Sequence, residues 1–134
     1  MRILNSTRRL VIDTNVLVSA LLSPKGTAAK LMEDVFDNAY ETVVTNSIIE
    51  EYIDVLNRPK FRIDKDIIEF VVQWFKDNSL WVEVDEDDYP KEEMPDPDDA
   101  VFYVTARCTG SLLVTKNIKH YPVTEWRTMI WELI

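Results

Sequence analysis

Four short segments of the chain place carboxylate or amide side chains where a strand is expected to end or a helix to begin. Because one fold can gather such positions, the sequence predicts a single acidic pocket. The chain has one Cys and one His, so this pocket would offer mainly oxygen ligands, which hard divalent cations prefer. A carboxylate-held cation can activate water and offset charge developing on phosphorus, which indicates metal-dependent phosphodiester chemistry. The segments are residues 10–15 (LVIDTN), 47–51 (SIIEE), 96–99 (DPDD) and 114–117 (VTKN).

The elements that must position these segments alternate between strand and helix along the chain. Such an order predicts a parallel sheet wrapped by helices and joined by right-handed crossovers. Ligands of such sheets bind beyond the carboxyl ends of the strands, which is where the four segments fall. The last stretch, about 124–134, is expected to hold a short strand, a turn of helix, or both. Strands are expected at 9–13, 41–45, 80–84 and 111–115, and helices at 14–22, 27–38, 47–56, 64–78 and 96–108.

The composition is that of one globular domain covering residues 1–134, long enough to bury a core without disulfides or structural zinc. No apolar run approaches the about 20 residues that span a membrane. The polar stretch 5–9 interrupts any N-terminal signal segment. Cys108 is the only cysteine, so no internal disulfide can form, which fits a reducing compartment. We therefore expect a cytoplasmic protein without a membrane partner.

The net charge of −9 is concentrated in one segment. Residues 85–99 contain nine acidic side chains and one Lys, a local charge of −8, which leaves 15 acids against 14 bases elsewhere. A nearly neutral remainder does not exclude a nucleic-acid substrate, because a metal and local basic patches can hold phosphates. The lack of net positive charge does argue against a protein that coats nucleic acid tightly by charge alone.

Helical geometry distinguishes the two adjacent glutamates Glu50 and Glu51. Ser47 and Glu50 have the spacing of a capping box, which gives Glu50 a structural role. At about 100° per residue, Glu51 lies at the edge of the expected apolar side of the helix, beside Ile48 and Val55. Glu51 is therefore the glutamate expected to reach the pocket.

Two of the acidic positions also have ordinary structural explanations. Asp13 lies after a strand and before a helix and is a good N-cap. If Asp13 is considered alone, this structural explanation is slightly favoured over a functional one. Asp96 followed by Pro97 is likewise a typical helix start, and acids in a first turn complement the helix dipole. Only the combination of all four segments favours a functional site.

Taken together, the segments resemble the PIN-domain family, and within it the toxin-like branch of small prokaryotic PIN proteins. The matching pieces occur in the family's order and spread over about residues 10–122. One such motif is a weak signal, whereas four in order are specific. The pieces are residues 11–16 (VIDTNV), 51–61 (EYIDVLNRPKF), 96–99 (DPDD) and 113–115 (LVT).

The resemblance implies an α/β fold of three layers, α/β/α, with a five-stranded parallel sheet, and a metal-dependent nuclease that cleaves RNA. The family's catalytic acids, which also bind Mg²⁺ or Mn²⁺, correspond to Asp13, Glu51 and Asp99. Asn15 and Thr115 correspond to polar supports of the metal site.

The fourth acidic position of the family, just after the last of these strands, is Asn117 here. An amide oxygen can still ligate Mg²⁺ but brings no negative charge. Three carboxylates fit one tightly bound cation, and a second cation would need the substrate phosphate to complete its site.

The resemblance also implies biological partners. The protein is expected to be the toxin of a toxin–antitoxin pair, inhibited by a small antitoxin protein, and to form a homodimer. Core or interface packing is the default expectation for the four tryptophans, and a core position for Cys108.

Basic residues near the pocket are candidates for phosphate contacts. Arg58 and Lys60 belong to the densest basic stretch, directly after the Glu51 helix, where a solvated turn is the alternative interpretation. Lys116, next to Asn117, either touches a phosphate or offsets local charge.

Two other classes of function stay open from the sequence. A catalytically weakened PIN fold that binds RNA or protein is one, because Asn117 removes a charge. A phosphatase with Asp13 as nucleophile is the other. It ranks low, since phosphatases of the haloacid dehalogenase type have a second Asp two residues later, where this chain has Asn15.

Overall fold

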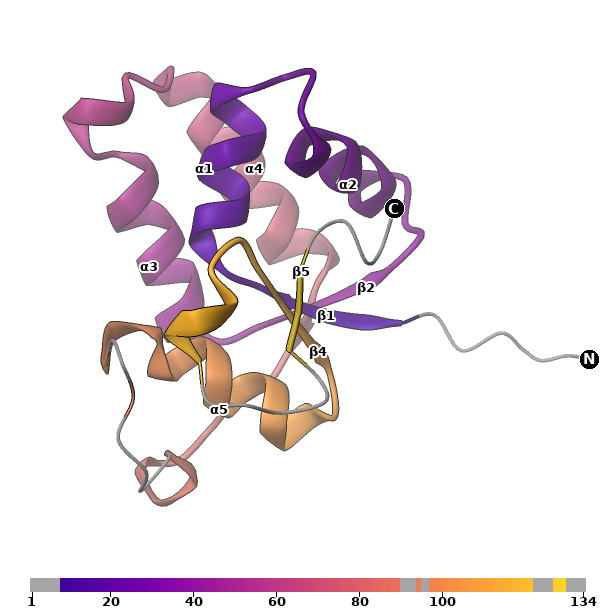
Figure 1. The fold of residues 1–134 in the computed structure, drawn as a ribbon, viewed down its shortest axis with the longest axis vertical. Coiled ribbons are helices and arrows are strands. Elements are labelled where there is room, and N and C mark those ends of the chain that lie inside the picture. The colour runs from indigo at the N-terminus through magenta and orange to yellow at the C-terminus, as the bar shows by residue number, and fades with distance from the viewer. Residues whose placement is uncertain (1–7, 90–93, 95–96, 122–126, 130–134) are drawn as a thin grey trace, which may run out of the picture.

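The computed structural model describes residues 8–89, 94, 97–121 and 127–129, and strands and helices alternate through them (Figure 1). Short 3₁₀ turns at Pro59–Phe61, Glu86–Asp88, Pro97–Asp99 and Ile118–His120 complete the described elements. The strands are β1 (Arg9–Ile12), β2 (Glu41–Val44), β3 (Leu80–Trp81), β4 (Leu112–Thr115) and β5 (Arg127–Met129). The helices are α1 (Thr14–Leu22), α2 (Thr27–Phe36), α3 (Asn46–Leu56), α4 (Lys65–Asn78) and α5 (Ala100–Thr109).

All the strand pairings are parallel, in the order β3-β2-β1-β4-β5. The predicted α/β fold with a parallel sheet is thereby confirmed. Four strands of three or four residues form the body of the sheet, and β3 adds a fifth strand of only two residues at its edge. The strand expected at 80–84 stops early because its partner β2 ends at Val44. The Val44 carbonyl accepts a hydrogen bond from Val82 N at 3.0 Å, just beyond the end of β3.

Helices cover both faces of the sheet. In Figure 1, α1, α2 and α4 lie on one side of the sheet and α5 lies on the other. The central strand β1 is accordingly a continuous apolar run, with Leu10, Val11 and Ile12 at most 1% exposed, as expected for a parallel strand that is buried on both faces. Of the helices in the described residues, none has the length and apolar character needed to cross a membrane.

The start of α3 differs from the sequence-based expectation. Thr45 leaves β2 in an extended conformation and its hydroxyl accepts from Ile48 N at 3.1 Å. Thr45 is therefore the N-cap, and the predicted capping box of Ser47 and Glu50 is wrong. Glu50 is exposed on this helix.

Other side chains also differ from their expected positions. Ile53 of α3 and Ile67 of α4 are 40% and 47% exposed, although apolar residues at helical spacing are expected on the buried side of a helix. Cys108, expected in the core, is exposed near the end of α5. Trp74 does pack as predicted, with its ring centroid 4.9 Å from that of Phe36. Trp126 and Trp131 lie outside the described residues.

Candidate functional site

The carboxyl ends of β1 and β4 lie side by side and form the base of the site. Ile12 pairs with Val114, and Asp13 N donates to the Val114 carbonyl at 2.9 Å. This pairing places Asp13, the first residue after β1, against Thr115, the last residue of β4. Two segments about one hundred residues apart in sequence therefore meet, as the parallel sheet predicts.

Four hydrogen bonds hold the Asp13 carboxylate, which is 4% exposed. Oδ1 accepts from Asn15 N at 3.3 Å, the contact that caps α1. Oδ2 accepts from Asn15 Nδ2 at 3.3 Å, Thr115 Oγ1 at 3.0 Å and the Tyr121 hydroxyl at 2.8 Å. Asp13 is thus both the N-cap of α1 and a fixed buried anion. Asn15 and Thr115 make the contacts that polar supports of this carboxylate would make.

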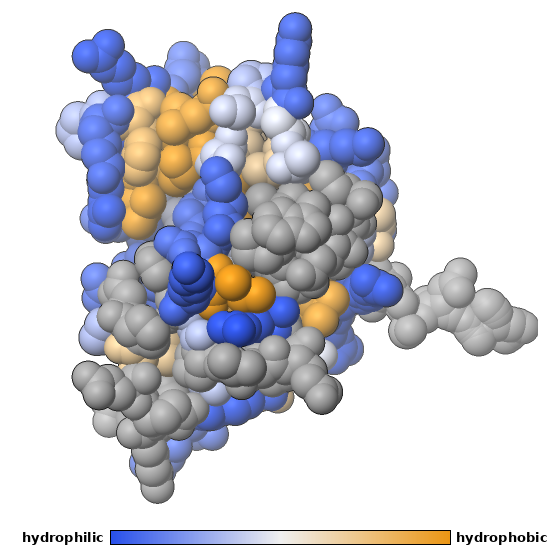
Figure 2. All heavy atoms as spheres, in the orientation of Figure 1, coloured by the Kyte–Doolittle hydropathy of each residue, from blue (hydrophilic) through white to orange (hydrophobic). Residues whose placement is uncertain are grey.

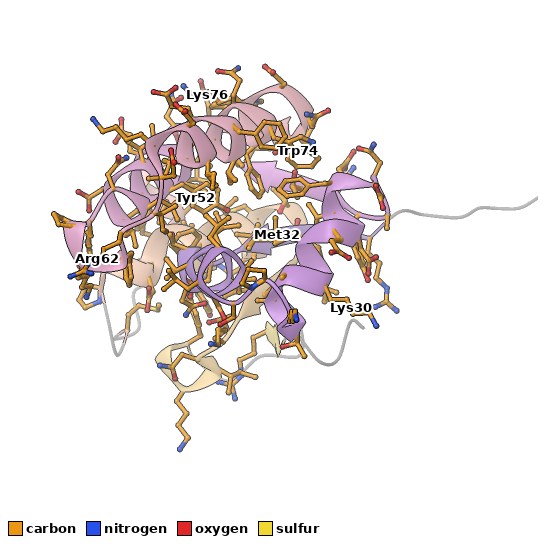
Figure 3. The ribbon with its side chains drawn as sticks, turned by 90° about the horizontal axis from the view of Figure 1, so that it is seen from above. Lys30, Met32, Tyr52, Arg62, Trp74 and Lys76 are labelled. Carbon is orange, nitrogen blue, oxygen red and sulfur yellow. The ribbon has the colours of Figure 1, made fainter. Side chains whose placement is uncertain are left out.

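Tyr121 is a part of the site that the sequence did not reveal. It follows the 3₁₀ turn Ile118–His120 and is 3% exposed. No spacing rule connects it to Asp13, so only the folded chain shows their contact. A second buried tyrosine, Tyr52 of α3, donates from its hydroxyl to the neighbouring Ile12 carbonyl at 2.6 Å. Figure 3 shows Tyr52 in the interior of the molecule.

A pocket of about 700 Å³ opens in front of Asp13. It brings together the predicted acids Asp13, Glu51 and Asp99, and it adds Asp98, the neighbour of Asp99 in the DPDD segment. Glu50 does not line it, in agreement with the expected difference between the two glutamates. Among the other predicted residues, Asn15, Arg58, Lys116 and Asn117 also line the pocket.

Asp98 and Asp99 reach the pocket from a turn rather than from the expected helix. Residues Pro97–Asp99 form a 3₁₀ turn, and α5 begins only at Ala100 with Asp99 at its N-cap position. Asp96, the predicted cap, lies outside the described residues. The Asp99 side chain makes no capping hydrogen bond to α5, and its Oδ2 atom is shielded from solvent. Asp99 thus lines the pocket without capping the helix that it precedes.

Negative charge accumulates around this pocket. Burial raises the pKa of Glu51, and the charges of Asp54, Asp98 and Asp13 raise it further, while Arg58 opposes them. Burial likewise raises the pKa of the Tyr121 hydroxyl, with added effects from Asp13 and Asp99. Tyr121 therefore stays protonated and remains a hydrogen-bond donor to Asp13.

The donor set fits a hard divalent cation, although the carboxylates are not drawn into one coordination shell. Within the described part of the chain, no three His, Cys, Asp or Glu side chains are grouped closely enough to hold a metal. Clustered carboxylates repel one another without a counter-ion, so separation is expected. The Thr14 hydroxyl, on a residue 4% exposed that lines the pocket, has no hydrogen-bond partner in the described protein. Oxygen donors, excess negative charge and this buried hydroxyl together suit Mg²⁺ or Mn²⁺.

Two of the three predicted phosphate-contact residues line the pocket. Lys116 Nζ contacts Ser19 Oγ at 3.1 Å, and its backbone N donates to Asn15 Oδ1 at 3.1 Å. Arg58 forms a surface ion pair with Asp54 at 3.3 Å. Lys60 is not among the lining residues, and its ammonium instead lies 5.1 Å from the ring centroid of Phe61. Arg62, from the same basic stretch, lies at the periphery of the molecule (Figure 3).

Removing the hydroxyl of Tyr121 is expected to weaken metal binding without unfolding the protein. Tyr121→Phe keeps the buried ring but deletes one of the described donors to Asp13 Oδ2, which loosens the orientation of this carboxylate. Loss of a group that orients a metal ligand costs about 10- to 100-fold in affinity. Calorimetric titration with Mn²⁺ measures the change.

Tyr52→Phe is the matched control for this measurement. It deletes an equally buried hydroxyl that bonds to a backbone carbonyl one residue away from Asp13. Its Mn²⁺ affinity should stay within about twofold of the wild type. Equal losses of affinity in both variants would mean that Tyr121 acts through general packing and not through Asp13.

Comparison with models of protein families gives a match over most of the chain. The sequence model of a family described as PIN domain matches residues 9–119 of the 134 in the chain. The matched region contains Asp13, Glu51, Asp99 and Asn117, and ends two residues before Tyr121. Comparison with curated protein sequences gave no match.

Proposed function

The chain belongs to the PIN-domain family, whose members are generally nucleases, and on this premise we propose that it is an Mg²⁺- or Mn²⁺-dependent endoribonuclease. The observation that carries the proposal is the pocket that Asp13, Glu51 and Asp99 line from three separate segments. The pKa of Glu51 also supports it: burial raises this pKa most, and the charges of nearby carboxylates raise it further, so a bound cation would offset the negative charge that accumulates there.

Each residue of the pocket has a role in this proposal. Asp13, Glu51 and Asp99 hold the cation, and Asn117 offers a neutral amide oxygen. Asn15 and Thr115 orient Asp13 through the hydrogen bonds described above. Bound there, the metal supplies Lewis-acid chemistry for hydrolysis of the phosphodiester.

Positive charge at the pocket supports phosphate binding. Lys116 and Arg58 both line it and carry charges that complement the phosphate backbone. The Lys116 ammonium is held beside Ser19, which keeps it at the pocket wall. Lys60 contributes less under this proposal, because its ammonium lies over the Phe61 ring.

We further propose that the protein is a toxin restrained by an antitoxin protein and that it forms a homodimer in the cytoplasm. The support is the resemblance of the motifs, together with aromatic side chains left exposed on α4 and β3. Phe70 and Trp81 are 64% and 42% exposed, and a protein contact would remove this apolar surface from water. Light scattering on the purified protein measures the oligomeric state directly.

The decisive experiment is cleavage of a mixed RNA pool by the purified protein with Mn²⁺ or Mg²⁺. Fragments are expected with either metal and none with EDTA. Asp13→Asn protein purified in the same way is expected to be inactive, which excludes a contaminating nuclease.

Cleavage that persists in EDTA, or that is equal in the Asp13→Asn protein, contradicts the proposal. RNA binding without any cleavage would favour the second function, a PIN fold that has lost activity. The neutral side chain of Asn117 is the feature of this chain that favours that alternative.

A further inference from the structure

The pocket in front of Asp13 has a second, apolar end. Val18 and Leu22 from α1 line it on one side, and Val55 and Phe61 line it on the other. Leu22 is 49% exposed, so its side chain is accessible to a ligand in the pocket. Figure 2 shows an apolar strip on the surface between α1 and α3, bordered by hydrophilic side chains.

The two ends of the pocket are related by helical geometry. Both α1 and α3 begin directly beyond strand ends, so the acidic end lies at their N-termini. Residues four apart share a helix face, separated by about 6 Å along the axis. Val55 therefore lies one turn beyond Glu51, and Leu22 lies two turns beyond Thr14. The apolar end continues the acidic end along the same faces of both helices.

This combination of chemistries matches one nucleotide of an RNA strand. A nucleotide has an anionic phosphate at one end and a largely apolar base face at the other, joined by a ribose. A phosphate held at the acidic end, beside Lys116, would have room for its base at the apolar end. Arg58, which also lines the pocket, carries a charge that suits a neighbouring phosphate.

We propose that the apolar end of the pocket, formed by Val18, Leu22, Val55 and Phe61, is a subsite for one unpaired nucleobase next to the cleaved phosphate. The proposal rests on the ribonuclease function proposed above and adds a requirement on its substrate. A base paired and stacked in a duplex cannot enter a side pocket, so the nucleotide at this subsite must be unpaired or flipped out. Apolar contact accepts any base face, which predicts weak preference for base identity.

Leu22→Ser tests the subsite, with Ile67→Ser as the matched control. Both replace a half-exposed aliphatic side chain, 49% and 47% exposed, with the same small polar residue. Ile67 lies on α4 and does not line this pocket. With a single-stranded oligoribonucleotide of ten bases and Mn²⁺, Leu22→Ser should raise KM about five- to tenfold with kcat little changed. Ile67→Ser should stay within about twofold of the wild type in both constants.

A base-deletion series separates contact with the base from other effects. The same oligoribonucleotide is prepared with one abasic position, moved along the strand. One abasic position beside the cleaved bond should lower kcat/KM about five- to tenfold in the wild type and have little further effect in Leu22→Ser. Such non-additivity identifies direct coupling between side chain and base. Additive losses, or equal behaviour of Leu22→Ser and Ile67→Ser, overturn the subsite.

Equilibrium binding keeps the test independent of cleavage. Fluorescence anisotropy of the labelled oligoribonucleotide with Mn²⁺ should show about five- to tenfold weaker binding to Leu22→Ser than to the wild type or to Ile67→Ser. If the wild type binds in this Leu22-dependent way but does not cleave, the ribonuclease function fails while the subsite stands. Cleavage with no dependence on Leu22 leaves the function and overturns the subsite. If the wild type shows neither cleavage nor Leu22-dependent binding, both the ribonuclease function and the subsite are overturned.

Discussion

Asp99→Asn is expected to lower metal-dependent RNA cleavage by about a thousandfold. The change keeps the size of the side chain and removes one negative charge at the pocket. Lewis-acid stabilisation of a phosphoryl group is worth several kcal/mol, and each about 1.4 kcal/mol is tenfold in rate. The Asp99 side chain makes no capping bond to α5, so its charge is not needed to cap that helix.

Asp87→Asn is the control for this variant. Asp87 belongs to the same acidic stretch, is exposed, and does not line the pocket. Asp87→Asn removes one negative charge, as Asp99→Asn does, so it reports any general effect of a lower negative charge on cleavage. Cleavage rates and Mn²⁺ affinity of both proteins, measured with their thermal melts, give the comparison. Full activity of Asp99→Asn, or equal losses in the two variants, refutes the assignment of Asp99 to the metal site.

Glu51→Gln is expected to lower cleavage about a hundredfold while leaving thermal stability unchanged or slightly higher. The loss follows from removing a charged metal ligand. The stability effect follows from the raised pKa of Glu51, since a carboxylate with a raised folded-state pKa destabilises the fold when ionised. This destabilisation develops as the pH rises above the pKa that Glu51 has in the unfolded chain, and it is absent below that pKa. Neutral Gln removes it at all pH values.

Glu50→Gln supplies a control from the adjacent residue of the same helix. Glu50 is exposed and outside the pocket, and Thr45 rather than Ser47 caps α3. Neither activity nor stability should therefore change beyond the ±0.5 kcal/mol that is usual for surface substitutions. Steady-state cleavage with Mn²⁺ and thermal melts at neutral and mildly acidic pH distinguish the two variants. Equal loss of activity in both would contradict the placement of Glu51 in the pocket.

The sequence by itself determined the parts of this protein that depend on neighbouring residues. Helix α1 begins after Asp13 and ends at Leu22, as predicted, because a capping carboxylate precedes it and a Ser-Pro pair follows it. Alternation of strands and helices likewise predicted the parallel sheet, and thus the meeting of Asp13 with the end of β4. Angles around a helix depend only on sequence spacing, so the sequence also predicted that Glu51, and not Glu50, lines the pocket.

The tertiary structure decided what depends on distant partners. The length of β3 is set by where β2 ends, and the cap of α3 by the extended exit of the chain at Thr45. The contact of Asp98 with the pocket follows from a 3₁₀ turn in place of a helix start.

Tyr121 illustrates the physical reason for this division most directly. Its hydroxyl meets Asp13 across 108 residues. Propensity and periodicity describe contacts within a few residues. A hydrogen bond between segments so far apart depends on how the whole sheet closes. The pairing of β1 with β4 brings their carboxyl ends together, and only then does a tyrosine beyond β4 become part of the site.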